Sequence, residues 1–404
     1  MIIKKSLCQY YTDNKIRPVY SKLIDTEMLN SYEWVRRKLF EYNLSIPIRT
    51  FKDASLLEFG PSTGENSLIF AKWGAQLSLV EPVDDFINGI NEYFTLHEVT
   101  KNLTSVKRST FEKFETDKKY DFVVAEGFIF HTGRPAYWLP RLSSFCKKGG
   151  FIVISHSETV GFIIELLHSK CLQFFQSYHN KDPLLLAKKL FLNKWNKVSH
   201  ARNFEAWAYD NLVNPTLSPN LLNSFMELQE VMAETGMIAW SSWPSVNNYT
   251  DISWIKKSTI DVKSVVQRNR FNFLSLLPSM VLGKHIRVNN QISKVGELLF
   301  SSLTSYVNSL AAPMEVDTFN REYIEKLQYE HNKIMEIFRL CVPNFYDTIL
   351  AELWQEISDC LKNISDVNID GAIKLFNGNG PLSEYWGCPN FYSVWHRYDQ
   401  DNKE

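Results

Sequence analysis

A short glycine turn, Gly60-Pro61-Ser62-Thr63-Gly64, carries the clearest chemistry in this sequence. It follows the apolar run "LLEF" (56–59) and precedes a helical pattern, an arrangement that lets the backbone approach a ligand where the helix begins. A nucleotide phosphate loop needs Lys and then Ser or Thr after its last glycine, but Glu65 and Asn66 stand there. A dinucleotide fingerprint would have its third glycine at position 65, and its pyrophosphate would meet the glutamate. Both kinds of site are disfavoured.

A second acid, Glu81, ends the next strand-like run, "LSLVEP", and Pro82 follows it. A carboxylate at the end of a second strand can accept hydrogen bonds from both hydroxyls of a ribose. The glycine turn and Glu81 therefore predict a site for a nucleoside that has no phosphate beside the turn.

These features resemble the methyl-donor site of the class I S-adenosylmethionine-dependent methyltransferases. The first motif of that family is an acid, an apolar residue and G-x-G-x-G, and here it reads Glu58-Phe59 followed by the turn 60–64, with Ser62 replacing the middle glycine. The resemblance implies S-adenosylmethionine as cofactor, with its methionine part near the turn and its ribose on Glu81. It also implies an adenine contact at Thr110 and Phe111, although the family more often has Asp where Thr110 stands.

The residues that could take a proton from the acceptor should lie just after the fourth and fifth predicted strands, because ligands bind beyond the carboxyl ends of such sheets. They are Glu126, His131 and His156. Histidine has an unperturbed pKa near working pH, which suits a general base. An alternative stays open for each histidine. His131 is then a loop histidine without a catalytic role. His156 then only follows Ser155, which has the capping-box spacing to Glu158 at the start of a helix.

Aromatic and polar residues after the fifth strand suggest where an acceptor could bind. Tryptophan faces beside carboxylate and amide groups suit a sugar or another planar ring. The candidate substrate residues are Trp207, Asp210, Asn211, Trp240 and Trp243. The alternative is that these tryptophans pack in the core between inserted helices and the sheet.

The elements that must position these residues alternate between strands and helices from residue 54 to residue 157. This alternation predicts βαβ units and a doubly wound, mainly parallel Rossmann-like sheet of seven strands. We expect a helical N-terminal cap (1–50) and a donor-binding domain (51–258) with a helical insertion at about 160–217. A helical region (259–385) and a possible last strand with its tail (386–404) follow, the strand pattern covering 391–396.

Composition limits the partners. Lys and Arg number 44 against 45 Asp and Glu, so no general basic field exists to hold a nucleic acid, and we expect no such partner. The six cysteines contain no C-x-x-C pair, which predicts reduced thiols in the cytoplasm, without a disulfide framework or a metal site. The longest apolar runs are half the length of a membrane span, so no membrane span is expected.

The whole chain, including "FEAWAYDN" and "IAWSSWPSV", is also similar to a large bacterial group of methyltransferases with helical additions, many of which accompany cell-surface polysaccharide synthesis. This similarity implies O-methylation of a sugar, a nucleotide-sugar or a surface-glycan intermediate. The alternatives are a protein or peptide methyltransferase, and a non-catalytic interaction module. A groove along 285–363 would favour the peptide acceptor, and an exposed apolar face on 319–340 would favour the module.

Overall fold

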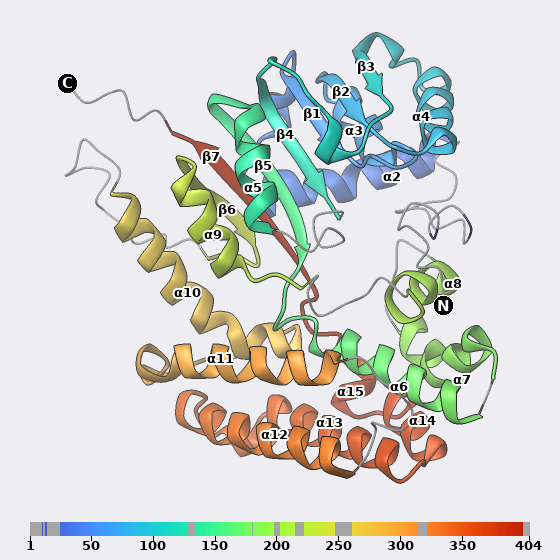
Figure 1. Cartoon of the computed structure of the whole chain (residues 1–404), viewed down its shortest axis with the longest axis vertical. Coiled ribbons are helices and arrows are strands. Elements are labelled where there is room, and N and C mark those ends of the chain that lie inside the picture. Colours follow the sequence, from blue (N-terminus) through green and yellow to red (C-terminus); the bar gives the residue numbers. More distant parts are fainter. Residues whose placement is uncertain are drawn as a thin grey trace. The chain divides into compact units, whose positions relative to one another are not determined.

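The computed structural model describes residues 10, 13, 25–127, 135–179, 181–197, 203–214, 222–246, 261–312 and 321–398. The chain divides into two compact units (Figure 1). The first contains residues 1–156, 225–270 and 391–404, and the second contains residues 157–224 and 271–390. Each unit is therefore assembled from segments that are distant in the sequence.

The first unit is built on a seven-stranded sheet in the order β3-β2-β1-β4-β5-β7-β6. Its strands are β1 (Ser55–Phe59), β2 (Gln76–Val80), β3 (Leu103–Lys107), β4 (Tyr120–Glu126), β5 (Cys146–Ser157), β6 (Met237–Trp243) and β7 (Asn390–Arg397). Strands β1 to β5 pair in parallel, whereas β6 and β7 pair with each other in the antiparallel sense. This is a Rossmann-like α/β fold, as predicted, and the strand pattern at 391–396 is β7, inserted between β5 and β6.

Helices cover both faces of this sheet (Figure 1). Apolar residues of α2 (Thr26–Arg37), α3 (Glu65–Lys72) and α4 (Asp84–Leu96) form one core with residues of β1, β2, β4, β5 and β7. On the other face lie α5 (Pro135–Phe145) and α9 (Phe225–Glu234), where Phe225 packs on Phe391 and Trp395. The strands are nearly continuous apolar runs because both of their faces are buried.

Alternation along the strands assigns the polar side chains near their carboxyl ends to one face or the other. Val124 of β4 and Val153 of β5 belong to the core under α2 and α3, so Glu126 and Ser155, which pair in register, lie on that same face. His156 is on the opposite face, with its ring centroid 5.4 Å from that of Phe391.

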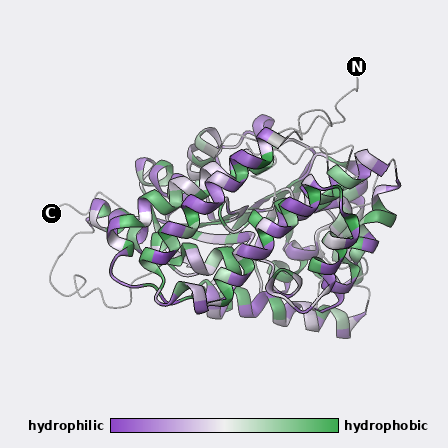
Figure 2. Ribbon diagram, turned by 90° about the horizontal axis from the view of Figure 1, so that it is seen from below, coloured by the Kyte–Doolittle hydropathy of each residue, from purple (hydrophilic) through white to green (hydrophobic). Residues whose placement is uncertain are grey.

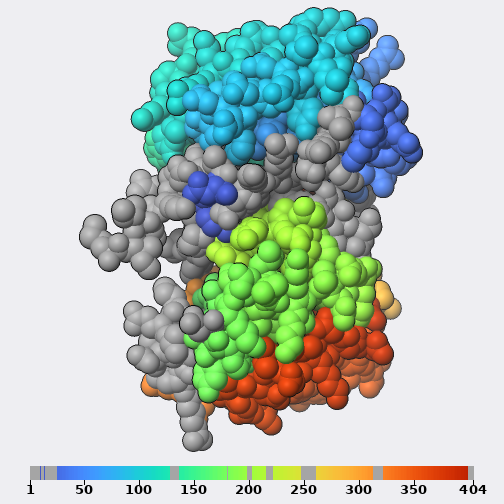
Figure 3. Space-filling model, turned by 90° about the vertical axis from the view of Figure 1, so that its right-hand side faces the viewer, coloured from blue at the N-terminus to red at the C-terminus, as the bar shows by residue number. Residues whose placement is uncertain are grey.

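The second unit is helical. Its helices are α6 (Ile163–His179), α7 (Pro183–Asn196), α8 (Phe204–Trp207), α11 (Ile292–Ala311), α12 (Arg321–Cys341), α13 (Ile349–Ser365), α14 (Ile369–Asn377) and α15 (Pro381–Glu384), together with the second half of α10 (Val262–Leu282). Helix α7 packs on α14, and α6 packs on α13. Figure 3 shows the same adjacency as green surface against red. The segments predicted as separate helical regions, 160–217 and 259–385, thus form one body, except that residues up to 270 belong to the first unit.

Amphipathic helices explain how this body folds. Most helices carry both hydrophobic and hydrophilic residues along their length (Figure 2). On α12, Leu327, Ile334 and Phe338 are fully buried, whereas Tyr329 and Leu340 are exposed. Helix α12 packs on α11 and α13. The predicted region 319–340 therefore has its main apolar face covered within its own unit. None of the helices that the structure describes is long and apolar enough to cross a membrane.

Candidate functional site

The predicted glycine turn and the predicted ribose acid lie together at the carboxyl ends of β1 and β2. The backbone N–H of Ser62 donates to Oε2 of Glu81 at 3.0 Å, and the N–H of Val83 donates to Oε1 at 3.0 Å. Gly60, Ser62 and Gly64 have φ values of 65°, 51° and 88°. The turn needs this left-handed backbone, which glycine adopts without strain and serine adopts at a cost.

Gly64 is required for a reason that the sequence does not reveal. It is the N-cap residue of α3, and a Cβ added to it would come within 2.9 Å of Cγ1 of Ile90 in α4. A side chain at position 64 is therefore excluded by packing between two helices as well as by the φ of 88°. Since glycine has no side chain, the first turn of α3 also receives no side-chain cap.

Burial sets the acid chemistry of this site. It raises the pKa of Glu81 to about 7, against the opposing effect of the two backbone N–H donors. Burial also raises the pKa of Glu58 to about 8, although Oγ of Ser67 donates to its carboxylate at 2.5 Å. Protonation of both carboxyl groups is therefore sensitive to what binds beside them.

The residues fit the nucleoside donor that the resemblance implies. Oγ of Ser62 is buried and has no hydrogen-bond partner among the described residues, so a polar ligand could satisfy it. The carboxylate of Glu81 accepts one backbone N–H on each oxygen and keeps further lone pairs for ligand hydroxyls. Next to the turn, Glu65 is fully buried, and both of its oxygens accept from Oγ1 of Thr63.

The predicted adenine contacts lie next to β1. The ring of Phe111 packs between Trp138, at a centroid distance of 3.8 Å, and Phe59, at 4.7 Å. Phe111 is only 5% exposed, whereas Thr110 is half-buried. Thr110 is thus the more accessible member of the predicted pair. Pro61 is buried in the turn, and Pro82 is half-buried after Glu81.

Arg36, which the sequence reasoning did not single out, is the partner of the predicted site residue Glu126. Its guanidinium forms a two-pronged ion pair with Glu126, at the end of β4. A signal was present in the sequence, because Leu29, Tyr32, Arg36 and Phe40 form one buried stripe of an amphipathic helix. A charged residue in such a stripe requires a buried partner of opposite charge, but the sequence does not name that partner.

The two histidines predicted as bases have different outcomes. His131 lies outside the described residues. His156 is 1% exposed and is on the opposite face of the sheet from Glu126. The capping box predicted for Ser155 and Glu158 is wrong, because β5 continues to Ser157 and α6 begins at Ile163. Oγ of Ser155 instead accepts a hydrogen bond from the N–H of Gly127 at 2.8 Å.

The predicted substrate residues do not form one group within a single unit. Trp207, Asp210 and Asn211 belong to the second unit, where Trp207 is 4% exposed and packs against Trp195 and other aromatic rings. Core packing therefore accounts for Trp207. Trp240 and Trp243 are on β6 of the first unit and are 45% and 40% exposed.

These two tryptophans lie at different levels of the sheet. Trp243 pairs in register with Tyr392 of β7, whose hydroxyl donates to Glu126 at 3.4 Å. Trp240 packs on Phe151, which is four positions before Ser155 in β5. Strands β5 and β7 separate β6 from β4, so Trp243 is related to the carboxyl end of β4 only through Tyr392.

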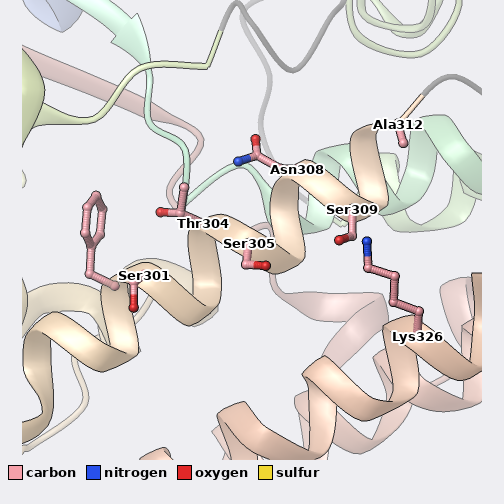
Figure 4. A pocket seen from close by; sticks show the side chains of 8 residues that line it. Ser301, Thr304, Ser305, Asn308, Ser309, Ala312 and Lys326 are labelled. Carbon is pink, nitrogen blue, oxygen red and sulfur yellow. The ribbon is translucent and has the colours of Figure 1, made fainter.

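A separate concavity of about 650 Å³ lies on α11 and α12 (Figure 4). It is lined by Phe300, Ser301, Thr304, Ser305, Asn308, Ser309, Ala312 and Lys326. None of the predicted site residues lines it. No group of three or more His, Cys, Asp or Glu side chains in the described part of the chain is placed to hold a metal ion.

Comparison with known proteins gives one family match. Residues 32–236, just over half of the chain, match the family model described as a methyltransferase domain. No curated protein matches. The match includes the turn 60–64, Glu81 and strands β1 to β5.

Among solved structures, the glycopeptide N-methyltransferase MtfA is 15% identical (26% of this chain, 47% of that one, TM-score 0.24). A Galdieria sulphuraria protein assigned as a sarcosine dimethylglycine methyltransferase is 11% identical (96% of each chain, TM-score 0.36). PKMT2 from Rickettsia typhi, in complex with AdoHcy, is 14% identical (58% and 49%, TM-score 0.38). The matched region spans about half the length of MtfA and of PKMT2.

Proposed function

The chain belongs to this methyltransferase-domain family, and we propose that it is an S-adenosylmethionine-dependent enzyme that methylates a hydroxyl of a sugar-type acceptor. The acceptor is a sugar, a nucleotide-sugar or a surface-glycan intermediate. The reaction takes place in the cytoplasm, in keeping with five buried, unpaired cysteines among the described residues.

The observation that supports this acceptor most is the position of Trp243. Its side chain is 40% exposed and lies opposite Tyr392, so the two side chains share one face at the end of the sheet. Tyr392 in turn contacts Glu126 at the carboxyl end of β4. An exposed aromatic face at this edge suits the apolar face of a sugar ring, with hydroxyls directed away from it.

The bound donor supplies a methyl group on a positively charged sulfur. In the proposed arrangement, the turn from Gly60 to Gly64 holds the methionine part, Glu81 accepts the ribose hydroxyls, and Thr110 with Phe111 borders the adenine. A sugar hydroxyl needs a base. His131, five residues after Glu126, is the stronger of the two proposed bases, because His156 lies on the other face of the sheet.

Thermal unfolding with S-adenosylhomocysteine, and with NAD and ATP as controls, tests the donor first. A ligand at about 100 times its Kd stabilises by about 2.7 kcal/mol, which raises the midpoint by several degrees. Acceptors are then screened by transfer of a labelled methyl group to free sugars, nucleotide-sugars and glycans. Transfer to amines or peptides but to no hydroxyl compound would contradict the proposed acceptor and leave the donor assignment intact.

A peptide acceptor is the second candidate, and the concavity on α11 and α12 favours it. That concavity lies within the predicted groove region 285–363, and five of its eight lining residues carry a hydroxyl or amide group that can bind a peptide backbone (Figure 4). This candidate would be supported if the wild type methylates a denatured-protein mixture and the variant Asn308→Trp does not. The non-catalytic module is less favoured, since the main apolar face of α12 is buried.

A further inference from the structure

The carboxyl end of β4 is fixed to the N-terminal helix by a buried ion pair. Nη1 of Arg36 lies 2.7 Å from Oε2 of Glu126, and Nη2 lies 2.6 Å from Oε1. The two side chains are only 5% and 6% exposed. The guanidinium also lies over the rings of Phe40 and Phe70, at 5.0 and 5.4 Å. A two-pronged pair in such a setting has one defined geometry, unlike a surface pair.

The pair extends to the helix that follows the glycine turn. Asn66, in the first turn of α3, donates from Nδ2 to Oε2 of Glu126 at 3.3 Å. The hydroxyl of Tyr32, one turn before Arg36 in α2, donates to Oδ1 of the same asparagine. Asn66 is therefore bonded on both sides, to α2 and to the end of β4, and it lies two residues after Gly64.

The carboxylate of Glu126 receives most of its hydrogen bonds on one oxygen. It accepts two bonds from Arg36, one from Asn66 and one from the hydroxyl of Tyr392. Three of these four donors share Oε2, whereas Oε1 accepts only from Nη2 of Arg36. The carboxylate of Glu126 thus joins α2 and α3 to the end of β4, and its catalytic role stays a prediction.

We propose that Arg36 is a positioning residue for the methyl donor. Through Glu126 and Asn66 it fixes the first turn of α3 against the end of β4, next to the turn that receives the methionine part. Helix α2 is then part of the donor site, although none of its side chains needs to touch the donor. This inference rests on the proposed placement of the donor at Gly60–Gly64 and is independent of the acceptor.

The test compares Arg36→Ala and Arg36→Lys with Arg37→Ala as the control. Arg37 forms a partly exposed pair with Glu41 and lies over the ring of Trp34. The affinity for S-adenosylhomocysteine is measured by calorimetry well below each unfolding midpoint, and the midpoint is measured without ligand. Arg36→Ala should bind about 10- to 100-fold more weakly. Arg36→Lys, which keeps the charge but loses the fork, should lie in between. Arg37→Ala should bind like the wild type.

A double variant distinguishes positioning from general destabilisation. If Arg36 acts through Glu126, Arg36→Ala/Glu126→Ala loses no more affinity than Arg36→Ala alone, because the buried carboxylate no longer remains unpaired. A folded Arg36→Ala with wild-type affinity, or losses that add in the double variant, would overturn the proposal. If Arg36→Ala does not fold, Arg36→Lys and Asn66→Ala give the same reading. Absence of binding to the wild type would instead refute the donor placement itself.

Discussion

The N–H of Ser62 and Oε2 of Glu81 form a 3.0 Å hydrogen bond that joins the glycine turn after β1 to the acid after β2. The two features that predicted a nucleoside site from separate parts of the sequence are thus in direct contact. The bond also keeps Ser62 in its left-handed conformation, at a φ of 51°, because the carboxylate holds its amide in place. Donor binding and the ionisation of Glu81 should therefore be coupled.

The first prediction concerns pH and Glu81. Its pKa is raised from 4.5 to about 7 in the folded protein, so its contribution to stability is complete below pH 4.5 and is lost as the pH rises through 7. Ribose hydroxyls favour the ionised form, so binding near pH 6 should release a proton. Calorimetry of S-adenosylhomocysteine in buffers of different ionisation enthalpy measures this release.

The variant Glu81→Gln serves as the control for that measurement. It should weaken donor binding by about 1–3 kcal/mol, and it should remove the proton release. If the proton release persists in Glu81→Gln, the proton comes from another group, such as Glu58, whose pKa is raised by burial to about 8.

The second prediction separates backbone strain from packing at Gly64. Gly64→Ala meets both a left-handed φ of 88° and Cγ1 of Ile90 at 2.9 Å. Gly236→Ala is the matched control, since its φ is 77° and nothing lies within 4 Å of the added Cβ. The control should lower the free energy of unfolding by about 1–2 kcal/mol, and Gly64→Ala should lower it further. Equal losses in chemical unfolding would contradict a packing role for Gly64.

The third prediction concerns the proposed bases. His131→Ala should abolish methyl transfer while leaving the affinity for S-adenosylhomocysteine unchanged, because a base contacts the acceptor and not the donor. His156→Ala should chiefly lower the unfolding midpoint, since His156 is buried against Phe391. Single-turnover rates and binding are measured for both variants. Full activity of both would refute a histidine base.

The fourth prediction tests the aromatic surface. Trp243→Ala should raise the KM for the acceptor about 2- to 12-fold, the range expected for the loss of one aromatic contact. Donor affinity should not change. Trp240→Ala is the control, because Trp240 is similarly exposed but packs on Phe151 at another level of the sheet. The same rise in KM for both variants would argue against a specific contact at Trp243.

The fifth prediction concerns a buried lysine in the second unit. Nζ of Lys194 lies 3.1 Å from Nε2 of His168 and donates to the carbonyl oxygens of Leu382 and Tyr385, at 2.7 and 2.8 Å. Lys194→Met leaves these acceptors without their donor. We expect a loss of about 3 kcal/mol in the free energy of unfolding.

Tryptophan fluorescence can follow this change, because Nζ of Lys194 lies 4.5 Å from the ring centroid of Trp386. Lys188→Met is the control: Lys188 forms a partly exposed pair with Glu205, which contributes about 0–1 kcal/mol. Equal effects of the two substitutions would show that the buried contacts of Lys194 add nothing to stability.

The sequence by itself determined the parts of the molecule that depend on near neighbours. The alternation of apolar runs and helical patterns predicted the sheet, including β7, because strand and helix periodicities are local. The turn 60–64 and Glu81 were recognisable because each lies at the end of its own strand, and parallel strands place their carboxyl ends at one edge.

Only the tertiary structure decided which distant residues meet. Arg36 and Glu126 are 90 positions apart, and their pairing depends on how α2 packs on the sheet, which no local pattern encodes. Trp207 and Trp243 are equally plausible acceptor residues in the sequence, but packing buries the first and leaves the second exposed. The sequence showed a charged residue in a buried stripe and aromatic residues near a site. Their partners and exposure follow from long-range packing, in which side chains compete for the same space.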